Sequence, residues 1–385
     1  MNFQLTSEQN LLRRSVREFA EREIRPHVTA WDEAQHFPLE LVPKLAALGL
    51  MGIECPEEYG GAGMSALDYC ICIEELARVC PGVALSVAAH NGLCLSHIAL
   101  VGTGHQKQRY LPALAGGDSV GAWALTEASS GSDAANMRTT AEFDGSQWVL
   151  NGSKAFTTHG RVGQILVITA ITNRSLGSKG ISAFIVERGT PGLSTGKKEN
   201  KLGMRASDTS EVVLQDCRVP AEQLLGREGQ GFVDAMRVLD RGRVGIAALA
   251  VGLAQGAYEA ASNYAHERKA FGKAIASFQA IQWKLADSAT EIEAGRLLTY
   301  SAAVAKDNGE SVTLPAAMAK LFTSEVACRV ADAGVQIHGG YGFIKDYPAE
   351  KYFRDVKLLT IGEGTSEIQR MVIARHLERR QAVLV

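Results

Sequence analysis

The sequence predicts a mostly α-helical protein with a β-rich middle domain. Long segments with helical hydrophobic periodicity lie at both ends of the 385-residue chain. From Val120 to about Pro220 the pattern changes to short alternating runs separated by Gly, Asn, Ser and Asp, which is typical of a small β-barrel or sandwich. We therefore expect an N-terminal helical domain over 1–119, a β-barrel middle domain over 120–230 and a C-terminal helical bundle over 231–385.

The N-terminal region begins with a helix start signal. Thr6 and Gln9 can form a capping box, and apolar residues at one-turn spacing follow them. Further helices are expected over 39–48, from Ser65 to Cys80, and from there to Val101. Because structure starts at once, we expect no targeting leader. We expect no apolar run long enough to span a bilayer, and therefore a cytoplasmic protein without a membrane span.

The middle region contains short runs with strand periodicity. The pair Asn151-Gly152 stands between two of these runs and is a hairpin signal. The candidate strands are Val120–Leu125, Arg138–Phe143, Gln147–Leu150, Ala155–Thr158, Gln164–Ile171, Ile181–Val186, Leu193–Lys198 and Ser210–Val219.

The C-terminal region returns to a helical period and keeps it. Helices expected at about 232–266, 278–308 and 314–338, with shorter ones at 347–357 and 366–379, predict an up-and-down bundle. The first long helix contains four glycines, each of which weakens a helix by roughly 1 kcal/mol relative to Ala. Close approach of a neighbour or ligand explains them better than propensity does; they are Gly242, Gly245, Gly252 and Gly256.

Composition excludes several classes of function. A net charge of −2 without a basic block argues against nucleic-acid binding. The 7 cysteines are scattered and lack metal-ligand spacing, so we expect reduced thiols, and for Cys70 and Cys72 buried structural ones. There is no dinucleotide-binding or phosphate-binding glycine motif, and we expect no metal site. His338, which precedes two glycines, is better explained as a structural or backbone-lining residue than as a metal ligand.

Five polar, glycine-rich stretches remain as candidate sites. Each has an ordinary structural alternative: a polar loop after a strand, a strand face, a basic helix end, a helix C-cap or a glycine turn before a helix. In the last stretch Glu363 stands between two glycines, and Ser366 with Gln369 is expected to cap the following helix. The stretches are 123–133, 151–158, 267–279, 336–342 and 359–370.

Taken together and in this order, the stretches resemble the acyl-CoA dehydrogenase family over essentially the whole chain. Trp123 to Asp133 is similar to the family's aromatic-x-x-Thr-Glu-x-x-x-Gly-Ser-Asp signature. Gln336 to Gly340 is similar to its Gln-x-x-Gly-Gly element, and Gly362 to Arg370 to its x-Glu-Gly-Thr-Ser-x-x-Gln-Arg element. The family's fold consists of an N-terminal helical domain, a β domain and a four-helix bundle.

The resemblance implies that FAD binds between the β domain and the bundle, partly across a subunit boundary of a homo-oligomer, expected to be a tetramer built as a dimer of dimers. By matching position, one group of residues would line the flavin, with Phe156 facing its ring and Thr158 near N5. A second group would hold the ADP part, and a third the other end of the cofactor. The flavin group is Trp123, Leu125, Thr126, Gly131, Ser132, Phe156 and Thr158; the ADP group is Arg268, Phe271, Gln279, Gln336, His338, Gly339 and Gly340; the third group is Thr365, Ser366 and Glu367.

The resemblance also implies a reaction. Glu363 matches the family's catalytic base, which removes the α-proton of an acyl-CoA thioester while hydride passes from the β-carbon to flavin N5, giving the trans-2-enoyl-CoA. An electron-transfer flavoprotein would accept the electrons. Matching positions for substrate contacts are Ser132, Asp240, Arg243 and Gly364, although a surface ion pair is an alternative role for Asp240 and Arg243. Some family members carry the base at the position of Gly242, which has no acid here.

Two departures from the family pattern concern the site. Phe156 stands where many relatives have Trp, so ring packing against the flavin is expected to differ. Gly362 stands where many have Tyr, which predicts a wider pocket and a bulkier acyl group, with the apolar helix of 88–95 as the pocket floor. Two other functions remain open: a flavin oxidase or monooxygenase of the same fold, and a catalytically silent flavin-binding assembly partner.

Overall fold

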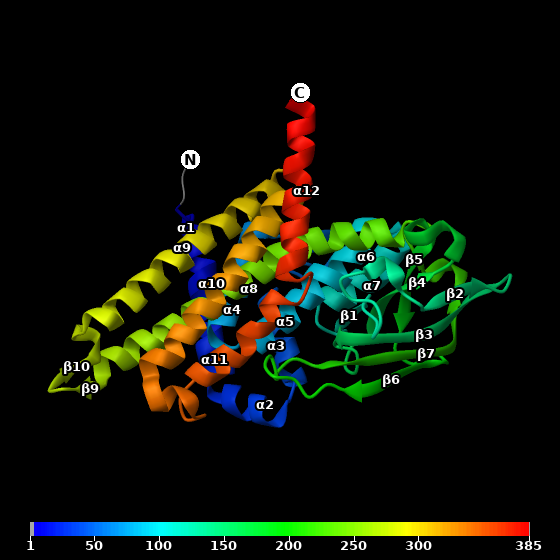
Figure 1. Cartoon of the computed structure of the whole chain (residues 1–385). Helices are drawn as coiled ribbons and strands as arrows, with labels where there is room; N and C mark the ends of the chain where they lie inside the picture. The colour runs from blue at the N-terminus through cyan, green and yellow to red at the C-terminus, as the bar shows by residue number, and fades with distance from the viewer. Residues whose placement is uncertain (1–3, 385) are drawn as a thin grey trace.

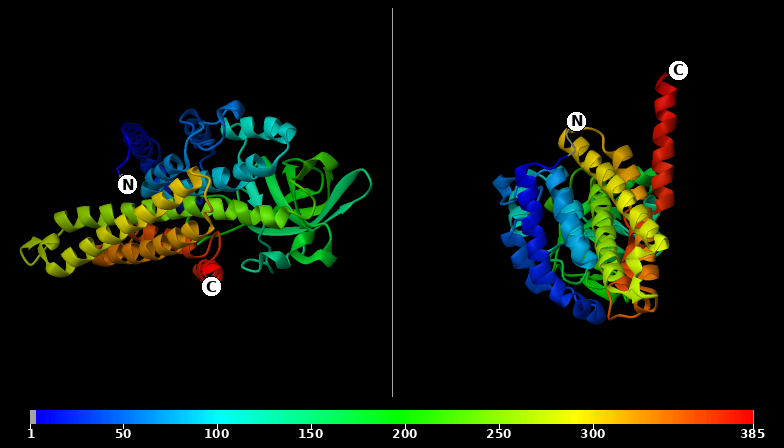
Figure 2. Two further views of the ribbon diagram at one scale, coloured as in Figure 1. Left: turned by 90° about the horizontal axis from the view of Figure 1, so that it is seen from above. Right: turned by 90° about the vertical axis from the view of Figure 1, so that its left-hand side faces the viewer.

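In the computed structural model, which describes residues 4–384, two helical regions and a β domain pack along one long helix (Figure 1). This helix, α8 (Gly231–Glu267), has 37 residues and runs from the β domain to the far tip of the bundle. Seen from above, the sheet lies at one end of the molecule and the bundle at the other (Figure 2). The arrangement confirms the predicted fold class of a helical N-terminal domain, a β middle domain and a C-terminal bundle.

Three of the N-terminal helices, those that begin after Thr6, Ser65 and Thr103, start at a capping box. The capping box of Thr6 is present as predicted, and the helix expected from Ser65 begins with a second capping box, formed with Asp68. Residues 39–41 form a 3₁₀ turn ahead of α3, and residues 90–95 form a π-helical turn inside the helix that reaches Val101. The helices are α1 (Ser7–Phe19), α2 (Val28–Ala34), α3 (Val42–Ala47), α4 (Ala66–Val79), α5 (Pro81–Ala89), α6 (Ser96–Val101) and α7 (Gly104–Ala115).

The middle domain is one mixed sheet of 8 strands. Its hydrogen-bonded order is β6-β7-β3-β2-β4-β5-β8, and β1 pairs in parallel with β4. Alternate residues of these strands bury an apolar interior that includes Trp148, Phe184 and Val212. The strands are β1 (Gly121–Ala124), β2 (Thr140–Phe143), β3 (Gln147–Thr158), β4 (Ile165–Ile171), β5 (Ile181–Glu187), β6 (Leu193–Lys198), β7 (Thr209–Pro220) and β8 (Leu224–Leu225).

The predicted hairpin at Asn151-Gly152 is wrong. Both residues lie inside β3, which joins the two runs expected as separate strands, and the register with β7 shifts between Leu150 and Gly152. Gly152 has φ 144°, and a Cβ there would lie 2.6 Å from Thr139 Oγ1. The glycine therefore serves a bulge and a close approach of neighbouring backbone instead of a chain reversal.

The bundle consists of α8, α9 (Gln279–Asp307), α10 (Thr313–His338) and α12 (Ser366–Leu384), with the short α11 (Ala349–Asp355) before the last helix. Their positions agree with the helical period of the sequence. A single apolar core joins α4 and α5 to α8 and α10, and Tyr69, Val244 and Val330 belong to it. α12 stands away from the body of the molecule in both figures.

Two segments, Pro81–Val101 and Gly231–Glu267, are long and apolar enough to cross a membrane by length and composition, contrary to the prediction from the sequence. Their most apolar windows are 72% and 78% buried within the protein. Burial of this kind is what the core helices of a folded domain require, and the cytoplasmic location stays a prediction. All 7 cysteines are free, and Cys70 and Cys72 are buried as predicted.

Candidate active site

The candidate site is built around the turn that precedes α12. Glu363 has φ 53° and Gly364 has φ 95°, so two successive residues adopt left-handed backbone conformations. For a residue with a Cβ, this conformation costs roughly 1–2 kcal/mol. Such strain persists only where the surrounding structure determines it.

The Glu363 side chain is half-buried, and one oxygen of its carboxylate, Oε2, points toward α8. Its Oε2 is inaccessible to solvent and accepts no hydrogen bond. A Cβ built at Gly242 would lie 2.6 Å from this oxygen and 3.3 Å from Leu93 Cδ2. Gly242 is therefore the position on α8 that makes room for the carboxylate, and the π-helical turn of residues 90–95 contributes the apolar neighbour.

The environment of Glu363 favours its neutral form. Burial raises the pKa of the Glu363 carboxyl to about 7, although Arg243 and then Lys320 act in the opposite direction by their positive charge. A carboxyl with a pKa in this range is well suited to general-base chemistry near neutral pH.

Donors from three helices hold the backbone of the turn. Arg243 Nε on α8 donates to the Glu363 carbonyl at 3.2 Å, and Lys320 Nζ on α10 donates to the Gly364 carbonyl at 2.6 Å. The amide of Gln369 on α12 donates to both carbonyls, at 3.3 and 3.0 Å. Together these hydrogen bonds stabilise the strained left-handed backbone of the turn.

The cap of α12 differs from the prediction. Thr365, not Ser366, caps the helix: Thr365 Oγ1 accepts from the Ile368 amide at 3.3 Å, while the Ser366 hydroxyl is buried without a partner. Gln369 does not close a capping box, because its side chain turns back to the Glu363 and Gly364 carbonyls. Tertiary contacts outweigh the local pattern here.

Arg243 is buried, with 5% of its surface exposed, so the alternative of a surface ion pair is wrong for it. Its Nη1 donates to Asp240 at 2.6 Å, and Asp240 also accepts from Thr313 Oγ1 at 2.6 Å. Arg243 thus connects the polar face of α8 to the turn of Glu363. The substrate contacts expected for Asp240, Arg243, Ser132 and Gly364 stay predictions.

A buried ion pair supports the loop after β1. Lys154 on β3 donates to Glu127 at 2.8 Å and to the Leu125 carbonyl at 3.1 Å. Glu127 also accepts from the Arg138 and Thr139 amides and from Thr139 Oγ1. Burial lowers the pKa of the Lys154 ammonium to about 8, against the attraction of Glu127. These buried contacts hold the loop that contains Thr126, Gly131 and Ser132, while Gly131 and Ser132 themselves face solvent.

Phe156 projects from the same surface. It has φ 54°, and its side chain is 64% exposed, at a register shift between β3 and β7. The Ala155 amide donates to the Thr126 carbonyl at 2.8 Å, which connects this bulge to the loop after β1. Thr158 ends the strand, and Trp123 Nε1 donates to His97 Nδ1 at 3.0 Å. An exposed aromatic ring on strained backbone, connected to a loop that carries hydroxyls, suits a planar polar ring.

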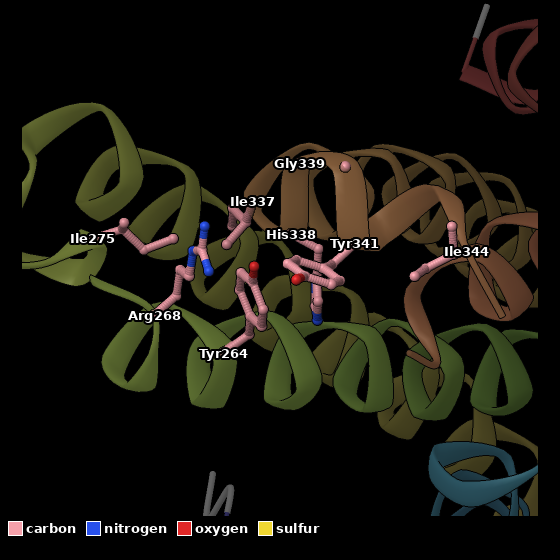
Figure 3. Close-up of a pocket in the computed structure, with 9 residues that line it drawn as sticks. Tyr264, Arg268, Ile275, Ile337, His338, Gly339, Tyr341 and Ile344 are labelled. Atoms are coloured by element: carbon pink, nitrogen blue, oxygen red, sulfur yellow. The ribbon is translucent and has the colours of Figure 1, made fainter. Parts of the chain in front are cut away.

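A second group of predicted residues lies at the far tip of the bundle. A cavity of about 480 Å³ opens there between the ends of α8 and α10 (Figure 3). Arg268 lies over the Tyr341 ring at 5.6 Å, and His338 stacks on Tyr264 at 4.4 Å. Phe271 is 95% exposed on the neighbouring hairpin. The cavity is lined by Tyr264, Arg268, Ile275, Ile337, His338, Gly339, Gly340, Tyr341 and Ile344.

The two groups lie at opposite ends of α8. Gly231, its first residue, packs on Ser182 of β5, whereas Arg268 follows its last residue. A helix of 37 residues is about 55 Å long. The flavin group and the ADP group of one chain therefore do not face each other.

Comparison with known proteins identifies the family to which this chain belongs. Models of the acyl-CoA dehydrogenase N-terminal, middle and C-terminal domains match residues 6–118, 122–217 and 229–378. The chain belongs to the acyl-CoA dehydrogenase family. "Acyl-CoA dehydrogenase, short-chain specific" from Clostridium acetobutylicum is 48% identical, covering 98% of this chain and 100% of the relative.

Solved structures of family members agree over the same length. Butyryl-CoA dehydrogenase from Megasphaera elsdenii superimposes with a TM-score of 0.96 at 43% identity, over 98% of this chain and 100% of the other. A chain from the structure described as "Electron transferring flavoprotein of Acidaminococcus fermentans: Towards a mechanism of flavin-based electron bifurcation" superimposes with a TM-score of 0.97 at 46% identity, over 98% and 99%.

Some residues of this acyl-CoA dehydrogenase site were not singled out from the sequence. Lys320, Lys154 and the second role of Gln369 appear only when three helices and a sheet come together. A usable signal exists for Lys320: it is a lysine among the buried alanines of α10, at positions 316, 317 and 319. A charged residue on a core-facing stripe indicates a buried polar partner.

Proposed function

We propose that this chain catalyses the FAD-dependent α,β-dehydrogenation of an acyl-CoA thioester, with Glu363 as the base that takes the α-proton. The observation that carries the proposal is Glu363 Oε2, a carboxylate oxygen that is inaccessible to solvent, has no hydrogen-bond donor and belongs to a residue on left-handed backbone between two glycines. A carboxylate in a purely structural role would be expected to have its oxygens satisfied.

The chemistry of Glu363 follows from this environment. The unpartnered oxygen keeps a lone pair free to accept a proton, and a pKa of about 7 leaves the carboxylate form available at neutral pH. After proton transfer the carboxyl becomes neutral, which is the form that its buried position favours. The α-proton of a thioester needs further activation, which backbone N–H donors at the site would provide to the thioester oxygen.

The residues present fit FAD. Phe156 and the loop with Thr126 and Ser132 offer a ring and hydroxyls to the flavin, and Arg268 offers a bidentate donor to its pyrophosphate. FAD, when bound, supplies the acceptor for the hydride from the β-carbon. Thr158, Phe271, Gln279 and residues 336–340 are proposed contacts by their matching positions.

We further propose that one FAD is held by two copies of the chain. The flavin group and the ADP group lie at opposite ends of the roughly 55 Å helix α8, so a second copy is needed to bring the Arg268 end to the flavin loop. The tetramer implied by the family resemblance would satisfy this requirement.

For the acyl group we propose a short chain. Tyr69 is fully buried one helical turn below Gly242, where a Cβ at Gly245 would lie 2.4 Å from its hydroxyl. Relatives described as short-chain and butyryl-CoA dehydrogenases agree with a shallow site. The bulkier acyl group predicted from Gly362 rests on the family resemblance, and the structure adds only that a Cβ there would meet Leu358 at an ordinary 3.5–3.7 Å.

The test is an anaerobic flavin-bleaching screen over straight, branched, cyclic and aryl-bearing acyl-CoAs. We expect bleaching with short saturated thioesters and formation of the enoyl-CoA. Flavin that stays oxidised with every thioester would contradict the proposal and favour a silent assembly partner. The proposed acceptor is an electron-transfer flavoprotein; rapid reoxidation of the bleached enzyme by air would favour an oxidase instead.

A further inference from the structure

We propose that Lys320 is a positioning residue of the reaction, which fixes the Gly364 carbonyl and places a positive charge behind the Glu363 carboxylate. This inference rests on the proposed function of Glu363 as the base. Lys320 lies on α10, and its closest polar contact is the hydrogen bond from Nζ to the Gly364 carbonyl at 2.6 Å.

The burial of Lys320 needs an explanation. Its side chain is 0% exposed, and its neighbours Ala316, Ala317 and Ala319 are buried as well. In the described part of the chain, no carboxylate forms a salt bridge with it, although buried cations normally have a charged partner. A neutral side chain would pack in such a place at lower free-energy cost. The position therefore calls for a role that an apolar residue could not fill.

The contact of Lys320 lies next to the catalytic residue. Glu363 and Gly364 both have positive φ, and a Cβ at Gly364 would lie 2.7 Å from Gln369 Nε2. Arg243 and Gln369 donate hydrogen bonds to the Glu363 carbonyl, while the Lys320 ammonium brings a full positive charge to the Gly364 carbonyl. Gln369 on α12 donates to both carbonyls, Arg243 on α8 adds a second donor to that of Glu363, and Lys320 on α10 adds a second donor to that of Gly364. The direction of the carboxylate is therefore set jointly by α8, α10 and α12.

The charges around Glu363 make the effect of Lys320 measurable. The facing groups are Arg243 on α8, Lys320 on α10 and Tyr69 on α4, while Glu367 on α12 and Glu325 on α10 act on Lys320. Glu325 is already paired with Arg370 at 2.7 Å. Burial lowers the pKa of the Lys320 ammonium to about 8, against the attraction of Glu363, so the residue is largely charged at pH 7. Loss of this cation leaves Arg243 alone to oppose the burial of the carboxylate.

The test compares Lys320→Met, which removes the donor and the charge, with Lys320→Gln, which removes the charge and keeps a donor. The control is Lys44→Met, which removes a surface lysine that pairs with Glu23 at 2.7 Å in the N-terminal domain. For each, the pH profile of kcat/KM with butyryl-CoA and the FAD-to-protein ratio after gel filtration are measured.

We expect both Lys320 variants to retain FAD and to shift the acid limb of the profile upward by roughly one pH unit, since they lose a nearby opposite charge. At pH 7 we expect kcat/KM to fall at least tenfold in Lys320→Met and less in Lys320→Gln. An acid limb that stays at the wild-type position in a variant that retains FAD would overturn the inference. If Lys320→Met does not fold, the position of the acid limb in Lys320→Gln alone tests the inference. A wild-type enzyme that butyryl-CoA does not bleach would instead count against the proposed function.

Discussion

Replacement of Gly242 by alanine should disable the base without unfolding the protein. The added Cβ would lie 2.6 Å from Glu363 Oε2, whereas ordinary contacts begin at 3.4 Å. The carboxylate must therefore move by about 0.8 Å. A misplacement of about 1 Å in a catalytic group can cost on the order of 10²-fold in rate. We expect the rate of anaerobic flavin bleaching to fall by about that factor.

The thermal stability of Gly242→Ala should not fall with its bleaching rate. Alanine is favoured over glycine inside a helix by about 1 kcal/mol, so Gly242→Ala should unfold at the wild-type temperature or above it. Gly104→Ala is the matched control, because the space around Gly104 on α7 is open and no atom lies within 4 Å of an added Cβ. This control should bleach at the wild-type rate.

The assay is stopped-flow bleaching with a saturating short-chain acyl-CoA under argon, together with the FAD-to-protein ratio and the thermal unfolding midpoint. A bleaching rate for Gly242→Ala within threefold of the wild type, with FAD retained, would refute the reasoning that Gly242 makes room for the base.

Further predictions concern the cofactor and the ionisation of Glu363. Arg268→Ala should lose FAD on gel filtration, because it removes the bidentate donor of the bundle-tip cavity; retention of the wild-type FAD ratio would contradict this. The wild-type kcat/KM should fall about tenfold per pH unit below a pKa of about 7, since only the deprotonated base accepts a proton; a flat profile from pH 5 to 8 would contradict it. The raised pKa also means that the folded state binds the proton more tightly than the unfolded chain, so Glu363 lowers stability as pH rises from 4.5 through 7. At pH 8 Glu363→Gln should therefore have a free energy of unfolding up to about 3 kcal/mol above that of the wild type, and a higher unfolding temperature. The difference should shrink toward pH 4.5, and equal unfolding midpoints at pH 8 would count against this prediction.

Features that depend on neighbouring residues could be predicted from the sequence. The capping box of Thr6 and the helix start at Ser65 formed as expected, and α8, α9 and α10 agree with the helical period. The order of the motifs led to the correct family because one motif of the β domain and two of the C-terminal region had to occur in register. The glycines of α8 were also explained correctly as close approaches, since Gly242 faces Glu363 and Gly245 faces Tyr69.

Features that depend on distant segments could not be predicted. Asn151-Gly152 has the composition of a hairpin turn, but Thr139 packs against Gly152 and the chain continues as one strand. Ser366 and Gln369 have the spacing of a capping box, but the carbonyls of the strained turn engage Gln369 instead. Lys320 lies 43 residues before Glu363 in the sequence, and only the packing of α10 against the turn brings them together.

The most direct test of the central claim is the rate of anaerobic flavin bleaching by butyryl-CoA in Glu363→Gln. Glutamine preserves the shape of the side chain but accepts no proton. We predict full FAD content and a rate at least 10²–10⁴-fold below the wild type, roughly the contribution of one general base. A Glu363→Gln enzyme that bleaches at a rate close to the wild type would contradict the account.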